Sequence, residues 1–252
     1  MSIIHSFDKK SEPIITAKDS LPKSNFSLAV CIINFSYKVM EALIEKGLLE
    51  ELDLPLKTVA NVYPVYKFKG SDIGVIKPGI GAVAVAGVVE ELSYMYSCKK
   101  FVMYGSCGGL DKSISPNLII VPTSAYRDEG ISYHYAPAND YIEIKNSNKV
   151  AQILKANKVE FVFGKTWTTD AFYRETKNNL EKRKADGCIA VEMEVSAMQA
   201  VCDFYGYEFY NFLYRADNLD SNKWERSILG LITIDDRLKN FAIALEVAKA
   251  VK

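Results

Sequence analysis

The chain has 252 residues, 49% of them hydrophobic, and its 31 basic side chains balance 31 acidic ones, so that the formal net charge is zero. This length allows one sizeable core, and we expect a single domain over residues 1–252. The balanced charge excludes the broad basic surface of a nucleic-acid-binding protein, and we expect no nucleic-acid partner.

Cysteine usage and hydropathy indicate where the protein works. Five cysteines are scattered without a CxxC pair and only two histidines are present, so no zinc, redox or other metal site is expected. The first ten residues are polar and lack the layout of a secretory signal. The longest uncharged stretch, residues 78–89, is shorter than the ~20 residues of a membrane-spanning helix. We therefore expect a soluble, cytoplasmic protein without a membrane partner.

Short apolar runs alternate with amphipathic segments along the chain, which favours an α/β fold with a central mixed or parallel sheet flanked by helices. In chain order, we expect a strand (28–34), a helix (36–52), two paired strands joined at Gly70 and Ser71 (62–70 and 72–79), a long helix opened by Gly79 and Gly81 that ends at Tyr96, a strand that runs into a glycine loop (99–109), a strand (117–126), a helix (146–157), a strand (159–169), a polar helix (174–184), a strand (187–192), a helix (193–206), a strand (207–215) and a C-terminal helix capped by Thr233. Ligands of such sheets bind at the carboxyl ends of strands, and the polar motifs described next lie there.

The first motif is GSCGG, at residues 105–109. Glycines allow a tight turn that exposes successive backbone amides, and Ser106 adds a hydroxyl donor, so the segment suits a phosphate group. A simple turn at the end of a strand is the alternative interpretation.

The second motif is AVEMEVSAM, at residues 190–198, in which Glu192 and Glu194 stand inside an apolar run. An acidic residue at a helix start can act as a cap, which is one interpretation of Glu194. Two carboxylates in apolar surroundings require partners, however, and a ligand with vicinal hydroxyls would provide them. Ribose is the obvious diol, because one carboxylate accepts two hydrogen bonds.

The third motif is RADNLDSNKW, at residues 215–224. Asp217 stands at the exit of an expected strand, where a general acid would be useful, although a loop aspartate can also cap a turn. Asp220 resembles such a turn cap more closely.

A dinucleotide-binding loop is a competing interpretation of Gly79, Gly81 and Ala84, which have the G-x-G-x-x-A spacing. A dehydrogenase would need an acidic residue about 20 positions later to bind a ribose hydroxyl. The strand expected there, KKFVMYG, contains no aspartate or glutamate. An NAD-dependent dehydrogenase is therefore only a remote alternative.

Taken in order, these motifs resemble the nucleoside phosphorylase family, which includes hexameric bacterial purine nucleoside phosphorylase, uridine phosphorylase and the methylthioadenosine nucleosidases. The resemblance extends from about Leu28 to the C-terminal helix and implies a single-domain, three-layer α/β sandwich. The segments that carry it are GIG (79–81), GSCGG (105–109), DEGISYHYAP (128–137), TTDAFY (168–173) and VEME (191–194).

The resemblance implies a role for each site residue. Glu194 would bind the ribose 2′- and 3′-hydroxyls while Met193 packs against the sugar, and Asp217 would protonate a departing purine. The residues expected at the base are Phe172, which would stack on it, and Tyr173. Glu192 would lie toward the base or toward a neighbouring hydrogen-bond network. His5 would reach the 5′-hydroxyl in a neighbouring subunit, which implies a homo-oligomer, either a dimer or a hexamer built from dimers. Residues 1–25 would then be an extension that contributes to the subunit interface.

Phosphate would be the co-substrate, held by Gly105, Ser106 and Lys38, and no organic cofactor is implied. The family's phosphate-binding arginines are missing, because Met103 occupies one such position and only Lys38 keeps a positive charge in the segment 34–38. A charged hydrogen bond contributes about 1.5–3 kcal/mol, so losing two would weaken phosphate binding by roughly 10²–10⁴-fold. Compensation by Lys38, Lys57 or Lys77 would restore it.

We therefore expect phosphorolysis of a nucleoside, with a purine favoured by Asp217, to give the free base and ribose 1-phosphate. The loop at 128–137 is closer to uridine phosphorylases, and Arg174, Thr176 and Asn178 are further candidates to read a base. A nucleosidase that hydrolyses its substrate, or a nucleoside-binding protein with weak catalytic activity, would also be compatible with these motifs. Against hydrolysis, the segment INFSYK lacks the glutamate with which nucleosidases activate water.

Overall fold

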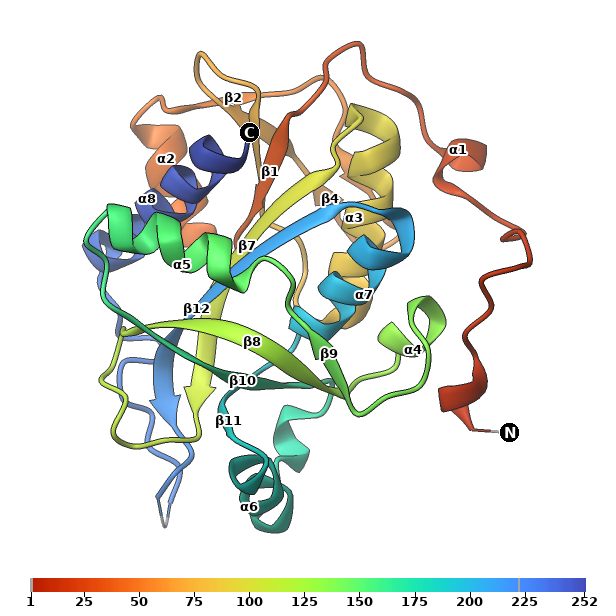
Figure 1. The fold of residues 1–252 in the computed structure, drawn as a ribbon. Helices are drawn as coiled ribbons and strands as arrows, with labels where there is room; N and C mark the ends of the chain where they lie inside the picture. Colours follow the sequence, from red (N-terminus) through yellow and green to blue (C-terminus); the bar gives the residue numbers. More distant parts are fainter. Residues whose placement is uncertain (1, 222) are drawn as a thin grey trace.

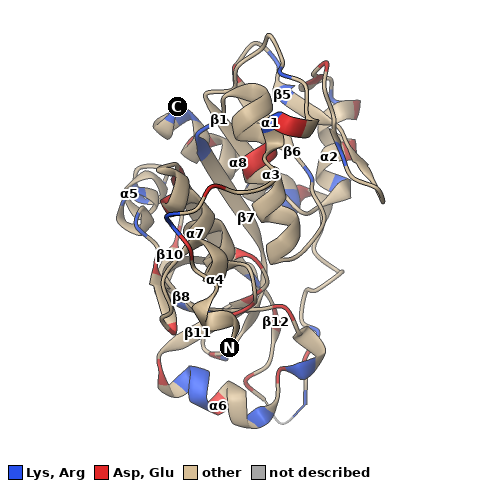
Figure 2. Cartoon of the chain, turned by 90° about the vertical axis from the view of Figure 1, so that its right-hand side faces the viewer, with Lys and Arg blue, Asp and Glu red and all other residues tan. Residues whose placement is uncertain are grey.

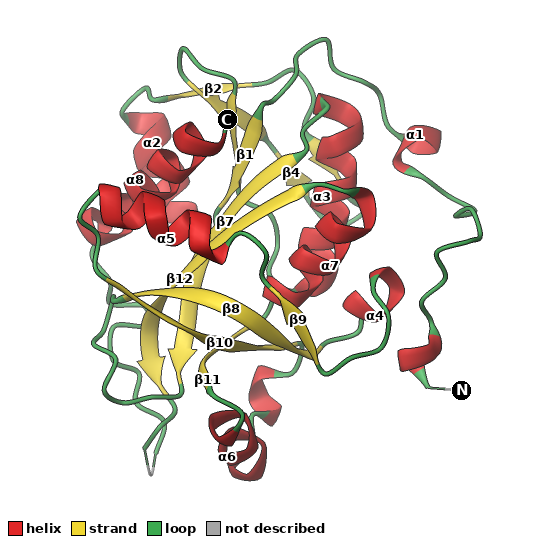
Figure 3. Ribbon diagram, viewed as in Figure 1, coloured by secondary structure: helices red, strands yellow, loops and turns green. Residues whose placement is uncertain are grey.

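The computed structural model of the protein describes residues 2–221 and 223–252. Within them, ten strands form one mixed sheet with helices on both faces, which confirms the predicted α/β fold (Figures 1 and 3). The strands are β1 (Val30–Ile33), β2 (Leu49–Glu51), β5 (Val65–Phe68), β6 (Ile73–Ile76), β7 (Lys100–Gly109), β8 (Ile119–Asp128), β9 (Tyr141–Glu143), β10 (Phe161–Thr169), β11 (Cys188–Glu192) and β12 (Glu208–Asn218), beside a separate pair, β3 (Leu56–Lys57) and β4 (Val62–Tyr63). The helices are α1 (Ala17–Ser20), α2 (Tyr37–Glu45), α3 (Ala82–Tyr96), α4 (Ser132–Tyr135), α5 (Ser147–Ala156), α6 (Lys177–Ala185), α7 (Val195–Tyr205) and α8 (Ile234–Val251), with short 3₁₀ turns η1 (Ile3–His5) and η2 (Phe172–Arg174).

Two hydrophobic cores lie on opposite faces of the sheet, and β1 contributes to both. Cys31 and Ile33 belong to the core formed with α3 and α7, whereas Val30 and Ile32 belong to the core formed with α2, α5 and α8. Because side chains alternate across a strand, a strand buried on both faces is a continuous apolar run. This explains why the run at 28–34 predicted a buried strand correctly.

The sheet closes on itself around β7. Its strand order is β11-β10-β8-β12-β7-β1-β6-β5-β2, and β11 also pairs with β7, so that five strands form a closed circuit of pairings. In this register Gly108 of β7 lies beside Val191 of β11 on one side and Asp217 of β12 on the other. The motifs at 190–198 and 215–224 therefore lie on either side of the motif at 105–109.

The glycine loop predicted at 105–109 is wrong, because β7 continues through Gly109. A β-carbon on Gly108 would come within 2.9 Å of Val191 Cγ1 in β11, and one on Gly109 would come within 2.8 Å of Arg215 Nε in β12. These glycines therefore allow two neighbouring strands to approach β7 closely, and they do not form a turn. Similarly, β12 extends to Asn218, so Asp217 lies within a strand and not in the loop after it.

The predicted helix at 36–52 ends early, at Glu45. Gly47 adopts a left-handed φ of +64°, its amide donates to the Ile44 carbonyl, and the Leu48 amide donates to the Leu43 carbonyl. This glycine-terminated arrangement ends α2 and lets residues 49–51 pair with β5 as β2. The strand predicted at 62–70 is also divided, at Pro64, into β4 and β5.

The N-terminal residues lie along the α3 and α4 side of the molecule (Figure 1). The turn η1 contacts α4, α1 contacts α3, and the Phe7 ring meets the Phe204 ring edge-on with 6.5 Å between centroids.

Basic and acidic residues are interspersed along the chain (Figure 2). Within the described ranges, none of the helices has both the length and the apolar composition to span a bilayer.

Candidate functional site

A cavity of about 700 Å³ brings together residues from all three sequence motifs. Its volume is within the usual range for small-molecule sites. The predicted site residues that line it are Ser106 of β7, Phe172 and Tyr173 of η2, Glu192 and Met193 at the β11–α7 junction, and Asp217 of β12.

Glu192 holds the start of α7 in place. Its Oε2 accepts hydrogen bonds from the backbone amides of Glu194 and Val195, both at 2.7 Å, and its Oε1 accepts from the Thr168 hydroxyl at 2.5 Å and the Thr166 hydroxyl at 3.3 Å. Burial and the charge of Glu194 raise the pKa of Glu192 to about 8, against the opposite effect of these hydrogen bonds. The capping role considered for Glu194 thus belongs to Glu192. Of the two positions expected for Glu192, toward the base or in a hydrogen-bond network, the four donors to its carboxylate agree with the network.

Glu194 is 7% exposed and connects α7 to the loop before α3. Its Oε1 accepts a hydrogen bond of 2.7 Å from the Gly81 amide, where a positive φ of 98° directs the backbone. Burial raises the pKa of this carboxyl to about 7. The Met193 amide also interacts with this carboxyl, and it acts with the Gly81 amide to lower the pKa. Glu194 itself does not line the cavity, although Glu192 and Met193 do, so its predicted contact with the sugar stays a prediction.

Asp217 lies on the cavity side of β12. Its Oδ2 accepts a hydrogen bond of 2.6 Å from Trp224 Nε1. Burial raises the pKa of Asp217, while the Trp224 bond and the nearby Arg215 charge act in the opposite direction. A carboxyl with a raised pKa beside a cavity fits a general acid. Asp220, by contrast, pairs with Lys184 and accepts from the Lys112 amide, as expected of a turn residue.

An aromatic pair forms the open side of the cavity. Phe172 and Tyr173 are 50% and 88% exposed, and their ring centroids lie 4.2 Å apart. Large exposed aromatic rings beside a cavity provide a surface on which a planar ligand can stack.

Glu175 is a cavity residue that the sequence did not reveal. It stands between Arg174 and Thr176, which were candidates to read a base, but Glu175 and Lys177 line the cavity instead. Burial and the charge of Asp217 raise the pKa of Glu175 to about 7. The segment had the composition of a solvated helix, so no local pattern distinguished this carboxyl.

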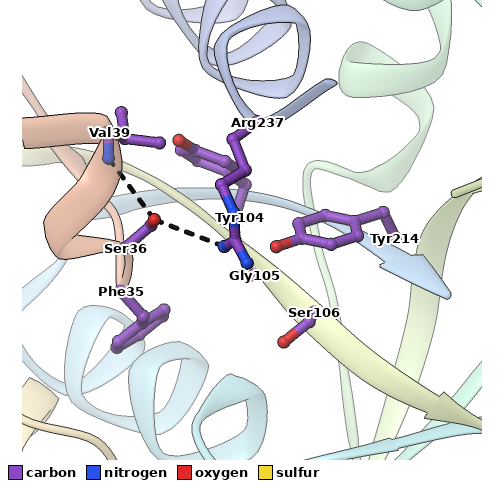
Figure 4. A pocket seen from close by; sticks show the side chains of 8 residues that line it. All are labelled: Phe35, Ser36, Val39, Tyr104, Gly105, Ser106, Tyr214 and Arg237. Atoms are coloured by element: carbon purple, nitrogen blue, oxygen red, sulfur yellow. Dashed lines mark hydrogen bonds between the residues drawn. The ribbon is translucent and has the colours of Figure 1, made fainter. Parts of the chain in front are cut away.

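A second, smaller pocket adjoins the cavity through Ser106, which lines both. Gly105 also lines it, as predicted for a phosphate site, together with Ser36 and Arg237 (Figure 4). Arg237 comes from the first turns of α8, which the sequence indicated only as an amphipathic helix.

Besides Glu194, two further predicted site residues lie outside both pockets. Lys38 is exposed on α2 and is absent from the lining of the small pocket, where Arg237 is the cation. His5 is exposed in η1 and lines neither pocket of its own chain. Its predicted contact with a neighbouring subunit stays a prediction.

Comparison with known proteins agrees with this arrangement. A model of the phosphorylase superfamily matches residues 29–250. Purine nucleoside phosphorylase DeoD-type 1 of Shewanella oneidensis is 30% identical over 166 residues, which cover 63% of this chain and 69% of that protein.

Two solved structures share the fold. Purine nucleoside phosphorylase from Toxoplasma gondii in complex with immucillin-H matches with a TM-score of 0.73 and 20% identity, over 95% of this chain and 96% of that chain. A futalosine hydrolase mutant of Helicobacter pylori matches with a TM-score of 0.68 and 16% identity, over 88% and 99% of the two chains. The resemblance drawn from the motifs is confirmed, and the protein belongs to the phosphorylase superfamily.

Proposed function

We propose that the protein is a nucleoside phosphorylase that cleaves a purine nucleoside with inorganic phosphate, giving the free base and ribose 1-phosphate. The observation that carries this proposal is the position of Ser106, which lines both pockets. A nucleoside in the large cavity and an anion in the small pocket would thus meet at one hydroxyl.

The sugar and the base are assigned to opposite parts of the large cavity. Met193 lines the cavity and packs against the sugar, and the adjacent Glu194 accepts hydrogen bonds from the ribose diol through Oε2. Phe172 and Tyr173 stack on the base, which places its imidazole edge toward Asp217. Glu192 acts indirectly, by holding the α7 terminus that carries Met193 and Glu194.

The chemistry follows from the charges that develop as the N-glycosidic bond breaks. The sugar gains oxocarbenium character, which the buried carboxylate of Glu194 stabilises, and the base gains negative charge. Asp217, with its raised pKa, donates a proton to the departing base. General acid catalysis of this kind typically contributes about 10²–10⁴-fold in rate. Phosphate then attacks the anomeric carbon from the side of Ser106.

Phosphorolysis is favoured over hydrolysis by the chemistry of the small pocket. Among the described residues, those that line this pocket provide hydroxyl, aromatic and aliphatic side chains, the Gly105 backbone and the Arg237 guanidinium. No carboxylate is among them. A hydrolase would need a general base there to activate water. A guanidinium and hydroxyl groups bind an oxyanion instead.

A purine is favoured over a pyrimidine because Asp217 and Glu175 both face the cavity. A purine offers an imidazole nitrogen that accepts a proton from one carboxyl, while its six-membered ring can form a hydrogen bond with the other.

The open side of the cavity is available to a neighbouring subunit, since the Tyr173 side chain there is 88% exposed. This is in keeping with the homo-oligomer and the His5 contact expected from the family.

Base release from inosine, adenosine and uridine, measured with and without phosphate, tests the proposal. We expect both purine nucleosides to be cleaved only when phosphate is present, with ribose 1-phosphate formed in an amount equal to the base. Base release at an equal rate without phosphate would establish a nucleosidase instead. Binding of nucleosides without turnover in any condition would establish a binding protein.

A further inference from the structure

The small pocket lies where the end of one strand and the starts of two helices meet. Gly105 and Ser106 come from β7, Ser36 caps the N-terminus of α2, and Arg237 belongs to α8 (Figure 4). The volume of the pocket is about 70 Å³. The large cavity is about 700 Å³, so the small pocket suits a small ion and not a nucleoside.

Arg237 directs a half-buried guanidinium into this pocket, between Ser36 and Tyr214 (Figure 4). Its Nη1 donates to Ser36 Oγ at 3.3 Å and its Nε donates to the Ile232 carbonyl at 3.4 Å. A guanidinium carries five N–H donors, so most of them remain available. No carboxylate of the described residues lies within 4.0 Å of Arg237, although the adjacent Asp236 pairs with Lys239. The positive charge therefore faces the pocket without a counter-ion.

Two tyrosine side chains, Tyr104 and Tyr214, also line the pocket. Tyr104 is 4% exposed, and its buried hydroxyl has no hydrogen-bond partner in the described structure. This hydroxyl points toward Val39, whereas the Tyr214 hydroxyl lies beside the Arg237 guanidinium on the side of Ser106 (Figure 4). Burial raises the pKa of both Tyr104 and Tyr214, so these phenols stay protonated and can donate.

The N-terminus of α2 adds a favourable dipole to the same pocket. Ser36 Oγ accepts from the Val39 amide at 3.4 Å, and this end of a nine-residue helix is the end that favours negative charge. The α2 terminus, the Arg237 guanidinium and the Ser106 hydroxyl thus line one small pocket, with the Tyr214 hydroxyl beside the guanidinium (Figure 4).

We propose that Arg237 is the phosphate-binding cation of this protein and that it replaces the arginines absent from the segment 34–38 and from position 103. The inference rests on the proposed function for the role of the anion as co-substrate. The guanidinium holds the anion from the α8 side, while Ser106 and the α2 terminus hold it from the sheet side. Phosphate affinity is thereby supplied from the C-terminal helix, about 200 residues away in sequence from the first strand.

Calorimetric titration of the purified protein with inorganic phosphate, in a buffer free of other oxyanions, tests this inference. Arg237→Gln is expected to weaken phosphate binding roughly 10- to 100-fold, the loss of one charged hydrogen-bonding group. Lys239→Gln is the matched control, because it removes one positive charge from the same helix at a side chain that is 73% exposed. Its phosphate affinity should equal that of the wild type.

The outcome separates this inference from the proposed function. If the wild type releases base without phosphate but binds phosphate through Arg237, the function is wrong and the anion site stands. If turnover requires phosphate and Arg237→Gln binds it as the wild type does, the inference is wrong and the function stands. Circular dichroism checks that each variant folds. If Arg237→Gln does not fold, Arg237→Lys replaces it, because lysine keeps the positive charge but lacks the planar guanidinium. Arg237→Lys should bind phosphate about tenfold more weakly than the wild type. Unchanged affinity in that variant would overturn the inference.

Discussion

Replacing Asp217 by asparagine is expected to lower the rate of purine nucleoside cleavage by roughly 10²–10⁴-fold, or about 3–5 kcal/mol in the barrier. Asparagine keeps the size of the side chain and can still accept the hydrogen bond from Trp224 Nε1, now 2.6 Å long. It has no acidic proton to give to the departing base. The loss should therefore appear in kcat, with the KM for the nucleoside changed far less.

The pH dependence of kcat supplies a second readout of the same change. Because Asp217 must be protonated to act, activity falls as pH rises through its pKa, which burial places above the usual range for aspartate. The variant should lose this alkaline limb. Asp220→Asn is the matched control, since Asp220 bonds to Lys184 and the Lys112 amide and does not line the large cavity. Equal rates for the wild type and Asp217→Asn on inosine would remove Asp217 from the mechanism.

Replacing Glu192 by alanine is expected to lower the free energy of unfolding by about 2–4 kcal/mol. The change leaves the amides of Glu194 and Val195 and two threonine hydroxyls without their acceptor, and each unsatisfied buried group costs about 1–3 kcal/mol. Water that enters the new space, and relief from burying a carboxyl whose pKa is raised to about 8, offset part of this loss.

Urea unfolding followed by far-UV circular dichroism, at one fixed protein concentration, measures this effect. Glu192→Gln is the matched comparison, because it keeps the volume and one carbonyl acceptor. Its loss should be about half that of the alanine variant. A stability of Glu192→Ala within about 0.5 kcal/mol of the wild type would show that the start of α7 does not depend on this carboxylate.

The elements of the fold could be predicted from the sequence wherever burial on both faces left a continuous apolar run. The run at 28–34 became β1, and the helical spacing after Gly81 became α3. The errors arose where pairing between distant strands decides the structure. Glycines at 105–109 have the composition of a turn, but they lie in β7 because β11 and β12 need space beside them. Composition alone cannot distinguish a glycine that bends the chain from one that admits a neighbour.

The candidate site was predicted in part for the same reason. Motifs at strand ends meet across the sheet, so Ser106, Met193 and Asp217 could be grouped before the structure was known. The separate roles expected for Glu192 and Glu194 came from the family resemblance alone, because their spacing does not show which carboxylate turns toward the α7 amides. Arg237 was missed entirely, since its contact with Ser36 joins residues 201 positions apart and leaves no local pattern.

A crystal structure with inosine and sulfate bound to the Asp217→Asn variant would test the assignment of both pockets at once. We expect the ribose hydroxyls to bond to Glu194 Oε2, the purine imidazole edge to face residue 217, and sulfate to lie between Ser106 and Arg237. A nucleoside bound outside the cavity between Phe172 and β12, or sulfate bound away from Ser106, would contradict this account.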